Sequence, residues 1–461
     1  MKSGYPFIIV NPFTNEVVAE INLAGESDIE EAISTAQSAF STTKNLPSYK
    51  RAAILESISN ILSARKEELA RLMTLESGKP IMYSRSELER AIFTFKYASE
   101  EAKRIGGETI PLDLASHSEK RFGIVRNFPI GPILAITPFN FPLNLVAHKV
   151  APCIATGNTM VLKPAPQAPL LALILGEIIL EAGAPAGMIN ILPTTNELAD
   201  KMVRDDRFKM LTFTGSAQVG WYLKTIAGKK KVVLELGGNA AVIVDKTADG
   251  VQYAKRIALG AYGQAGQSCI KVQRIYIHKE IAETFTENFV TATKATKYGN
   301  PLEDDTIVGP LIDKTTADRI ESWINEAISN GAKLLAGGKR NGLLIEPTIL
   351  TSTRNDMKVV CEEIFGPVVT LHEFQTIEEV VREVNDSKYG LQAGIFSNDF
   401  KNIFYSYENL EVGGVVVNDF PTYRIDHMPY GGIKDSGLGR EGIKYAIEEM
   451  TEKKLLVVNL G

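Results

Sequence analysis

The chain has 461 residues, of which 44% are hydrophobic and 23% are charged, and its formal net charge is −5. This length predicts two or three domains, and this composition is ordinary for a globular protein. The basic residues are spread along the chain, so we expect no nucleic-acid partner. The most apolar segment, residues 169–183, contains two glutamates and is too short to span a bilayer, so we expect no membrane contact either.

The cysteines and histidines exclude some kinds of site. Cys153, Cys269 and Cys361 have no paired spacing, which predicts neither a disulfide framework nor a metal centre, and is typical of a reducing compartment. The five histidines show no metal-binding spacing. The opening run, MKSGYPFIIVNPFTNE, lacks the long apolar core of a signal peptide. We therefore expect a cytoplasmic protein without a metal.

The first hundred residues are expected to be mainly helical, because apolar residues recur at helical spacing in residues 28–40, 49–78 and 84–107. Extended runs follow at 121–129 and 131–139. Strands are then expected at 158–165, 189–193, 209–215, 230–236 and 240–245, with helices at 169–184, 197–205 and 215–229. A second series has strands at 271–279, 343–350, 368–374, 393–399 and 413–419, helices at 282–297, 316–332, 377–386 and 399–410, and a last strand at 453–460. This alternation predicts an α/β fold of two domains with mainly parallel sheets.

Cys269 has unusual neighbours for a cysteine. The run GQAGQSCIKVQR, residues 263–274, surrounds it with small and polar residues. Either this cysteine fills a gap where nothing larger fits, or its sulfur is accessible to a ligand. By contrast, Cys153 lies in an apolar helical stretch and is interpreted as a core residue, and Cys361 is given a structural role as well.

Two motifs follow predicted strands, where ligands of parallel sheets bind. FTGSAQVG, residues 213–220, opens a helix; its glycines either let the backbone approach a phosphate or simply form a tight turn. KPAPQAPL begins with Lys163, which either bonds a ribose or a phosphate or is an ordinary surface lysine.

Two further motifs contain polar residues suited to catalysis. Asn140, between prolines and aromatics in ITPFNFPLN, either donates to an oxyanion or caps a turn. Glu235, in LELGGNAA, either has the raised pKa of a general base beside apolar residues or is an exposed residue at a strand end. The segments EEIFGPVV and MPYGGIKDSGLGREG indicate no role by themselves. A Ser-His-Asp hydrolase is poorly supported because no GxSxG motif occurs.

Taken together, these segments resemble the aldehyde dehydrogenase superfamily over nearly the whole chain. TPFNFP, KPAP, FTGS, LELGG, GQSC, EEIFGPV and PYGGxKxSGxGREG occur in the order and at the spacing of the family. Glu235 and Cys269 are 34 residues apart, as in the family pattern. Seven motifs in register make the resemblance specific, and it is strongest to the non-phosphorylating lactaldehyde and glycolaldehyde dehydrogenase branch.

The resemblance implies a catalytic set. Cys269 matches the nucleophile, Asn140 the oxyanion-binding amide, and Glu235 the base that activates water. The implied reaction oxidises an aldehyde to its acid through a cysteine thiohemiacetal and a thioester. A CoA-acylating relative is disfavoured because Glu235 is present, and a catalytically silent protein on the same fold is disfavoured because all three residues are present.

The resemblance also implies a nicotinamide cofactor. Lys163 matches the residue that binds the adenosine ribose, and Glu363 matches the ligand of the nicotinamide ribose. Pro166 stands where many NAD-preferring members have a glutamate, so either NAD or NADP is expected. The full set of expected cofactor residues is Thr137, Pro138, Phe139, Lys163, Pro166, Gly215, Ser216, Val219, Leu236, Gly237, Glu363 and Phe365.

Three residues are expected near the substrate: Ser268, Arg424 and His427. Ser268 is not the basic residue found there in some relatives that bind phosphorylated aldehydes. Arg424 either holds a hydroxyl, carboxylate or sulfonate, or forms an ion pair at the domain edge. We expect a short polar aldehyde similar to lactaldehyde or glycolaldehyde, with succinate semialdehyde as the alternative.

The resemblance finally implies three structural units. A Rossmann-like cofactor domain is expected at residues 1–112 and 131–234, and a catalytic α/β domain at 235–440. A small β oligomerisation arm is expected at 113–130 and 441–461. Unpaired strand edges invite pairing between subunits, so a homodimer or homotetramer is expected.

Overall fold

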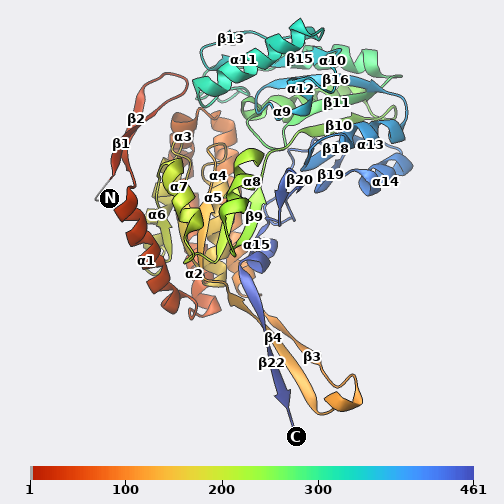
Figure 1. The fold of residues 1–461 in the computed structure, drawn as a ribbon. Helices are drawn as coiled ribbons and strands as arrows, with labels where there is room; N and C mark the ends of the chain where they lie inside the picture. Colours follow the sequence, from red (N-terminus) through yellow and green to blue (C-terminus); the bar gives the residue numbers. More distant parts are fainter. Residues whose placement is uncertain (1–3) are drawn as a thin grey trace.

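The computed structural model describes residues 4–461, and its N-terminal part combines a hairpin with four helices (Figure 1). The hairpin is formed by β1 (Tyr5–Val10) and β2 (Val17–Leu23), which the expectation of a mainly helical start missed. The helices are α1 (Glu26–Thr43), α2 (Ser48–Ala64), α3 (Lys66–Ser77) and α4 (Ile81–Ala102). The single helical run predicted at 49–78 is two helices, because the chain leaves helical geometry at Arg65 (φ −104°, ψ 16°).

A six-stranded sheet has the order β21-β9-β8-β5-β6-β7, with β21 antiparallel to β9 and the other strands parallel. Its strands are β5 (Pro132–Ile136), β6 (Thr159–Lys163), β7 (Ile189–Ile191), β8 (Met210–Thr214), β9 (Lys231–Glu235) and β21 (Gly437–Leu438). The helices between them are α5 (Asn144–Thr156), α6 (Leu170–Glu181), α7 (Asn196–Arg204) and α8 (Ala217–Ile226).

Both faces of this sheet are covered, because successive side chains of a strand point to opposite faces. In β5, Ile133 and Ala135 join the core shared with α2 to α6, whereas Leu134 and Ile136 join the core shared with α1, α7 and α8. Cys153 on α5 is fully buried in the first of these cores, which confirms its predicted place.

A seven-stranded sheet has the order β12-β15-β16-β11-β10-β18-β19, with only β12 antiparallel to its neighbour. Its strands are β10 (Ala240–Val244), β11 (Val272–His278), β12 (Lys333–Ala336), β15 (Thr348–Thr351), β16 (Val368–Phe374), β18 (Gln392–Phe396) and β19 (Gly414–Val417). The helices that accompany it are α9 (Gly250–Tyr262), α10 (Ala282–Ala295), α11 (Lys314–Ser329), α12 (Lys358–Cys361), α13 (Ile377–Asn385) and α14 (Phe400–Asn409). The two α/β units predicted from the alternation are therefore present.

Two small ribbons lie outside these sheets. They pair β13 (Arg340–Asn341) with β14 (Leu344–Ile345), and β17 (Tyr389–Gly390) with β20 (Ile433–Lys434). The single strand expected at 343–350 is therefore two strands, β14 and β15, separated at Glu346 and Pro347.

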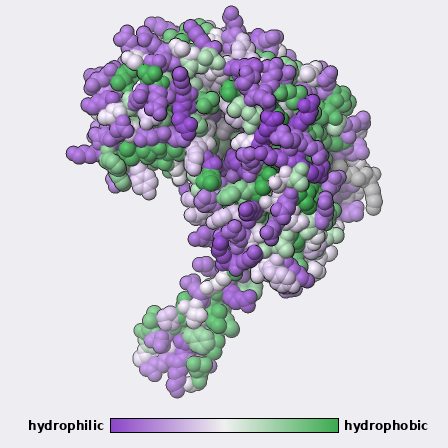
Figure 2. Space-filling model, turned by 180° about the vertical axis from the view of Figure 1, so that it is seen from behind, coloured by the Kyte–Doolittle hydropathy of each residue, from purple (hydrophilic) through white to green (hydrophobic). Residues whose placement is uncertain are grey.

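A three-stranded antiparallel sheet, the arm, projects from the body and carries the C-terminus (Figure 1). Its strands are β3 (Gly107–Pro111), β4 (Arg121–Pro129) and β22 (Thr451–Asn459). Apolar side chains lie on its surface (Figure 2), among them the exposed residues Leu455, Leu456 and Val457.

The division into domains stays a prediction, but three elements belong to a different part of the fold from the one that the predicted boundaries give them. β3 precedes residue 113 and still joins the arm. The helix α15 (Ile443–Glu449) contacts α4 and α5 rather than extending the arm. β21, from the segment predicted as catalytic, returns to the six-stranded sheet beside β9. Single-strand periodicity does not reveal which sheet a short strand will join.

Residues 4–461 offer neither a membrane-spanning helix nor a cluster of metal ligands. No helix among residues 4–461 combines the length and apolarity needed to cross a membrane. Within the same residues, no group of three or more His, Cys, Asp or Glu side chains is arranged to hold a metal ion.

Candidate active site

A cavity of about 1160 Å³ lies where the loops after β5, β8 and β9 meet the segment around Cys269. Predicted residues on its wall are Pro138, Phe139, Asn140, Gly215, Ser216, Glu235, Leu236, Gly237, Ser268, Cys269, Glu363, Phe365 and Arg424. The carboxyl ends of the parallel strands β5, β8 and β9, where ligands of such sheets bind, therefore meet segments that lie just before β11 and β16.

Five predicted residues do not line this cavity: Thr137, Lys163, Pro166, Val219 and His427. Thr137, Lys163 and Pro166 still lie at or just beyond the ends of β5 and β6, and Val219 lies in the first turn of α8, the helix that follows β8. His427 is different, because its exposed ring lies against Phe93 and Tyr97, with ring centroids 6.1 and 5.4 Å away. The structure therefore does not bring His427 together with Cys269, although the neighbouring Arg424 does reach the cavity.

An unusual backbone precedes Cys269. Gln264, Ala265 and Gly266 all have positive φ angles, of 55°, 55° and 67°. Non-glycine residues rarely adopt this conformation. A Cβ at Gly266 would lie 2.3 Å from the carbonyl oxygen of Gly366, so only glycine fits there. The small residues before Cys269 thus serve a left-handed turn that presents the cysteine at the cavity wall.

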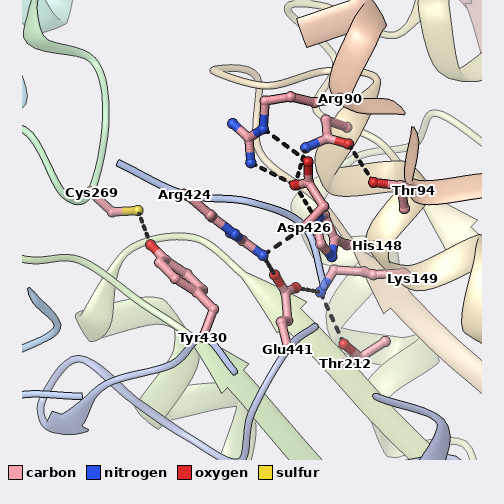
Figure 3. A network of polar contacts seen from close by, with 11 residues as sticks. Arg90, Thr94, His148, Lys149, Thr212, Cys269, Arg424, Asp426, Tyr430 and Glu441 are labelled. Atoms are coloured by element: carbon pink, nitrogen blue, oxygen red, sulfur yellow. Dashed lines mark hydrogen bonds and ion pairs between the residues drawn. The ribbon is translucent and has the colours of Figure 1, made fainter. Parts of the chain in front are cut away.

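The Cys269 thiol is partly exposed, and its sulfur lies 3.0 Å from the hydroxyl oxygen of Tyr430 (Figure 3). Burial raises the pKa of Cys269 to about 12, and the hydrogen bond with Tyr430 opposes this increase. Cys269 therefore lines the cavity, as the alternative of an accessible sulfur requires, and its role as a nucleophile stays a prediction.

Glu235 ends β9 with its carboxylate inside the protein. The residue is 3% exposed, and neither carboxylate oxygen has a hydrogen-bond partner among the described residues. Burial, and then the nearby charge of Glu441, raise the pKa of Glu235 well above its ordinary value. Glu235 is therefore buried, as its apolar neighbours suggested, and not exposed at the strand end; its role as a base stays a prediction. A carboxyl whose pKa is raised by burial holds a proton more readily than an exposed one, which suits a group that accepts a proton during a reaction.

Asn140 lies in the loop between β5 and α5. Its side-chain nitrogen donates to the backbone carbonyl oxygen of Gln267, 3.0 Å away, and its backbone carbonyl oxygen accepts from the side-chain nitrogen of Gln264. An amide nitrogen carries two N–H groups, so one is left for a ligand oxygen after this contact. The loop containing Asn140 and the turn before Cys269 are therefore joined by two hydrogen bonds.

A chain of buried charges lies behind Tyr430 (Figure 3). The Arg424 guanidinium carbon lies 3.7 Å from the centre of the Tyr430 ring, and an Arg424 Nη donates to Glu441 at 3.0 Å. Glu441 also accepts from Lys149 Nζ at 3.3 Å. Burial opposes ionisation of Glu441, but the charges of Lys149 and Arg424 prevail and lower its pKa to about 2. The ion pair expected as one alternative for Arg424 is thus present, inside the cavity wall rather than at an exposed edge.

Next to this chain lies a second buried charge, the carboxylate of Asp426, which is 2.8 Å from the ring nitrogen of His148 (Figure 3). Asp426 also accepts two hydrogen bonds from Arg90, at 2.7 and 3.1 Å. Burial would raise the pKa of Asp426, but the hydrogen bond with His148 and the charge of Arg90 hold it well below its usual range.

Sequence reasoning assigned no role to four residues of these networks: His148, Lys149, Tyr430 and Glu441. They belong to the segments NLVAHKVAP and MPYGGIKDSGLGREG. No residue pattern within either segment indicates that the two meet in space.

A buried ion pair supports the Asn140 loop. Lys79 and Glu87 pair with side chains 1% and 0% exposed, and Glu87 also accepts the backbone N–H groups of Leu143 and Asn144, both at 2.9 Å. These N–H groups lie at the start of α5, where a carboxylate is favoured.

Replacement of Lys79 by methionine is expected to lower the free energy of unfolding by about 3–5 kcal/mol, because it leaves the Glu87 carboxylate buried without its partner. Chemical denaturation followed by circular dichroism measures the change. Lys66→Met is the matched control, since its pair with Glu89 is exposed and is worth at most about 1 kcal/mol. Equal effects of the two substitutions would contradict the expectation.

The strand ends beside the cavity fit a dinucleotide. Lys163 is mostly buried, and the one hydrogen bond of its amine to residues 4–461 is a 3.3 Å contact with Asn196. Burial lowers the pKa of Lys163 to about 8. The buried hydroxyls of Thr137 and Thr214 have no hydrogen-bond partner among the described residues. Ser216 caps the N-terminus of α8, the kind of helix end that binds phosphate.

Comparison with known proteins gives the family. The model of the aldehyde dehydrogenase family matches residues 2–456. The chain belongs to the aldehyde dehydrogenase family. It is an NAD(P)-dependent oxidoreductase that acts on aldehydes, and the fold and cofactor class predicted from the motifs are confirmed.

Among curated proteins, this aldehyde dehydrogenase is 45% identical over 453 residues to 3-sulfolactaldehyde dehydrogenase of Priestia aryabhattai, covering 98% of this chain and 94% of that one. It is 41% identical over 456 residues to lactaldehyde dehydrogenase of Methanococcus aeolicus, covering 98% and 97%. Among solved structures, aldehyde dehydrogenase 21 of Physcomitrella patens, in complex with the reaction product succinate, superposes with a TM-score of 0.98 at 48% identity, covering 100% of this chain and 96% of that one. Glyceraldehyde-3-phosphate dehydrogenase GapN of Methanocaldococcus jannaschii, complexed with NADP, superposes with a TM-score of 0.95 at 41% identity, covering 100% of both chains.

Proposed function

We propose that this aldehyde dehydrogenase oxidises a short polar aldehyde to its carboxylic acid by covalent catalysis at Cys269. The observation that carries the proposal is the shared cavity, onto which the Cys269 thiol, the Asn140 amide and the partner-free carboxylate of Glu235 all open. A nucleophile, an oxyanion donor and a base within one site are the parts that acyl chemistry needs.

In the proposed mechanism the Cys269 thiolate attacks the aldehyde carbon and forms a C–S bond, giving a thiohemiacetal. The side-chain N–H of Asn140 and the backbone N–H of Cys269 donate to the oxyanion. Loss of hydride from the thiohemiacetal carbon gives the thioester, and NAD(P), held by the residues named below, would supply the oxidising chemistry. Glu235 then takes a proton from a water molecule, which attacks the resulting thioester and releases the acid and the Cys269 thiolate.

We assign the cofactor to the strand ends beside Cys269. Lys163 and Glu363 would hold its two riboses, and Gly215 and Ser216 would hold its pyrophosphate. The contact between Gly237 and Glu363 supports this assignment. A Cβ at position 237 would lie 2.3 Å from a carboxylate oxygen of Glu363, so only glycine lets the Glu363 carboxylate lie against the backbone there. Pro166 adds no carboxylate that would repel a 2′-phosphate, so we propose that both NAD and NADP are accepted.

Arg424 supports a polar substrate. Its guanidinium lines the cavity with Cys269, and its Nε–H is buried without a hydrogen-bond partner among residues 4–461. A buried donor without an acceptor is unfavourable, so a substrate oxygen near Arg424 would be stabilised. Arg90 adds a second guanidinium to the same wall. We therefore favour aldehydes with a hydroxyl or anionic group near the carbonyl, and the names of the relatives from Priestia and Methanococcus agree with this class.

Arg424→Ala is expected to lower kcat/KM about 10- to 100-fold for lactaldehyde, glycolaldehyde and 3-sulfolactaldehyde relative to an apolar aldehyde, because a hydrogen bond to a charged group is worth about 1.5–3 kcal/mol. Steady-state assays with NAD and with NADP give the ratio for each aldehyde. The ratio corrects for general damage to the fold, and Arg340→Ala, whose ion pairs lie outside the cavity, serves as the control. An unchanged ratio would show that Arg424 does not select the substrate.

Succinate semialdehyde is the second candidate substrate. The observation that favours it is the bound succinate in the plant structure at 48% identity. Including succinate semialdehyde in the same assays separates the candidates, since the preferred substrate is the one with the highest kcat/KM in the unmodified enzyme. A catalytically silent protein would turn over none of these aldehydes.

We also keep the prediction of a homodimer or homotetramer in the cytoplasm. The exposed apolar strand β22 supports self-association, because unpaired edges and apolar surfaces favour contacts between subunits.

A further inference from the structure

Tyr430 is held firmly beside the predicted nucleophile. Its backbone N–H donates to the carbonyl of Glu441 at 3.1 Å, and its carbonyl accepts from the N–H of Glu441. Its ring packs with Ile270, Leu391 and Cys269 in one small apolar cluster. This fixed position places the hydroxyl oxygen 3.0 Å from the Cys269 sulfur, a distance at which a hydrogen bond to sulfur forms (Figure 3).

The Arg424 guanidinium lies over the Tyr430 ring, with its carbon 3.7 Å from the ring centre. A cation over an aromatic face draws electron density from the ring. Because the ring loses electron density, its hydroxyl becomes a stronger hydrogen-bond donor. Arg424 itself is held by its ion pair with Glu441. The guanidinium therefore contacts the Tyr430 ring, and the Tyr430 hydroxyl contacts the sulfur, in fixed positions.

We propose that the Tyr430 hydroxyl is a catalytic group that donates a hydrogen bond to the Cys269 thiolate, and that Arg424 strengthens this donation through the Tyr430 ring. The proposal rests on the proposed function, in which Cys269 is the nucleophile. It adds a residue whose hydroxyl, rather than its ring alone, contributes to the reaction.

The surroundings of Cys269 explain why a donor is needed. Burial is the main cause that opposes ionisation of the thiol, and the charges of Glu363, from the loop after α12, and Glu235, from β9, add to it. Arg424 and Tyr430, both from the segment after β19, act in the opposite direction. Because a hydrogen bond to the thiolate lowers the thiol pKa, loss of the Tyr430 hydroxyl raises it. Phenylalanine removes that hydroxyl and keeps a ring for Ile270, Leu391 and Arg424 to contact.

The test measures alkylation of Cys269 by iodoacetamide as a function of pH, with the labelled peptide identified by mass spectrometry. A Cys361→Ser background removes the other partly exposed thiol, while Cys153 is fully buried. We expect Tyr430→Phe to react about tenfold more slowly at neutral pH, because its rate–pH curve shifts upward by roughly one unit. At high pH, where both thiols are ionised, the two rates should meet.

Controls separate the hydroxyl from packing and from the mechanism itself. Tyr298→Phe, which removes an exposed hydroxyl bonded to Glu346, should leave the curve unchanged. A Tyr430→Phe curve with the same midpoint overturns the proposal, whether or not its plateau is lower, because a packing defect lowers the rate at every pH. Full dehydrogenase activity in Cys269→Ser would instead refute the proposed function, and is a separate observation.

The contribution of Arg424 is tested by a double-mutant cycle. Arg424→Ala should shift the midpoint upward in the enzyme with Tyr430, and by less in the Tyr430→Phe enzyme. Equal shifts in the two backgrounds would show that Arg424 acts on the sulfur independently of the ring, which overturns that part of the proposal.

Discussion

Cys269→Ala is expected to lower aldehyde dehydrogenase turnover by on the order of 10⁴-fold or more, the scale of loss when a covalent nucleophile is removed. No other described thiol can replace it, because Cys153 is fully buried and Cys361 is absent from the cavity wall. Binding of NAD(P) should persist, since the residues proposed to hold the cofactor are unchanged. Nicotinamide absorbance measures turnover, and equilibrium titration measures cofactor affinity.

Cys361→Ala is the matched control for this experiment and should retain nearly full turnover. Activity of Cys269→Ala within about tenfold of the unmodified enzyme would place the chemistry on another residue. Loss of both turnover and cofactor binding would instead indicate a damaged fold, and a circular dichroism spectrum would identify that case.

Glu235→Gln is expected to slow release of the acid by roughly 10²- to 10⁴-fold, the contribution of a positioned general base. Attack by Cys269 does not use Glu235 in the proposed mechanism. The variant should therefore form about one equivalent of NAD(P)H for each site and then turn over slowly. Rapid mixing followed by mass spectrometry of the intact protein would detect the accumulated acyl-enzyme.

The pH dependence gives an independent check on the same residue. A general base acts only when it is deprotonated, and burial raises the pKa of Glu235 well above its ordinary value. The rate of thioester hydrolysis should therefore increase as the pH rises through that raised pKa, and Glu235→Gln should lack this increase. Glu283→Gln, on the surface helix α10 and away from the cavity, is the control. An identical pH profile for the Glu235 variant would rule out Glu235 as the base.

Much of the fold was predictable because it depends on local patterns. Alternating strands and helices over residues 158–245 indicated a helix-covered parallel sheet, and Ile133 to Ile136 do bury side chains on both faces. The hairpin of β1 and β2 was missed, because its residues do not alternate clearly between buried and exposed positions. The short strands β20 and β21 were also missed, since two residues are too few to show a period.

The candidate site divides in the same way. Glu235 and Asn140 could be found because each lies in a compact motif with an unusual neighbourhood. Tyr430 and Lys149 could not be assigned, because their partners are 161 and 292 residues away in the chain. His427 was expected near the substrate because it belongs to the same segment as Arg424, yet its ring lies against Tyr97 and only Arg424 lines the cavity.

The sequence by itself determined the family, the two α/β units and the identity of the residues proposed for catalysis, because motif spacing and hydrophobic periodicity are local properties of the chain. Tertiary structure alone decided which charges surround the thiol: Tyr430 reaches Cys269, Arg424 covers the Tyr430 ring, and Glu441 holds Arg424. The physical reason is that burial and electrostatic interaction depend on distance in space, and packing of two sheets and their loops sets that distance.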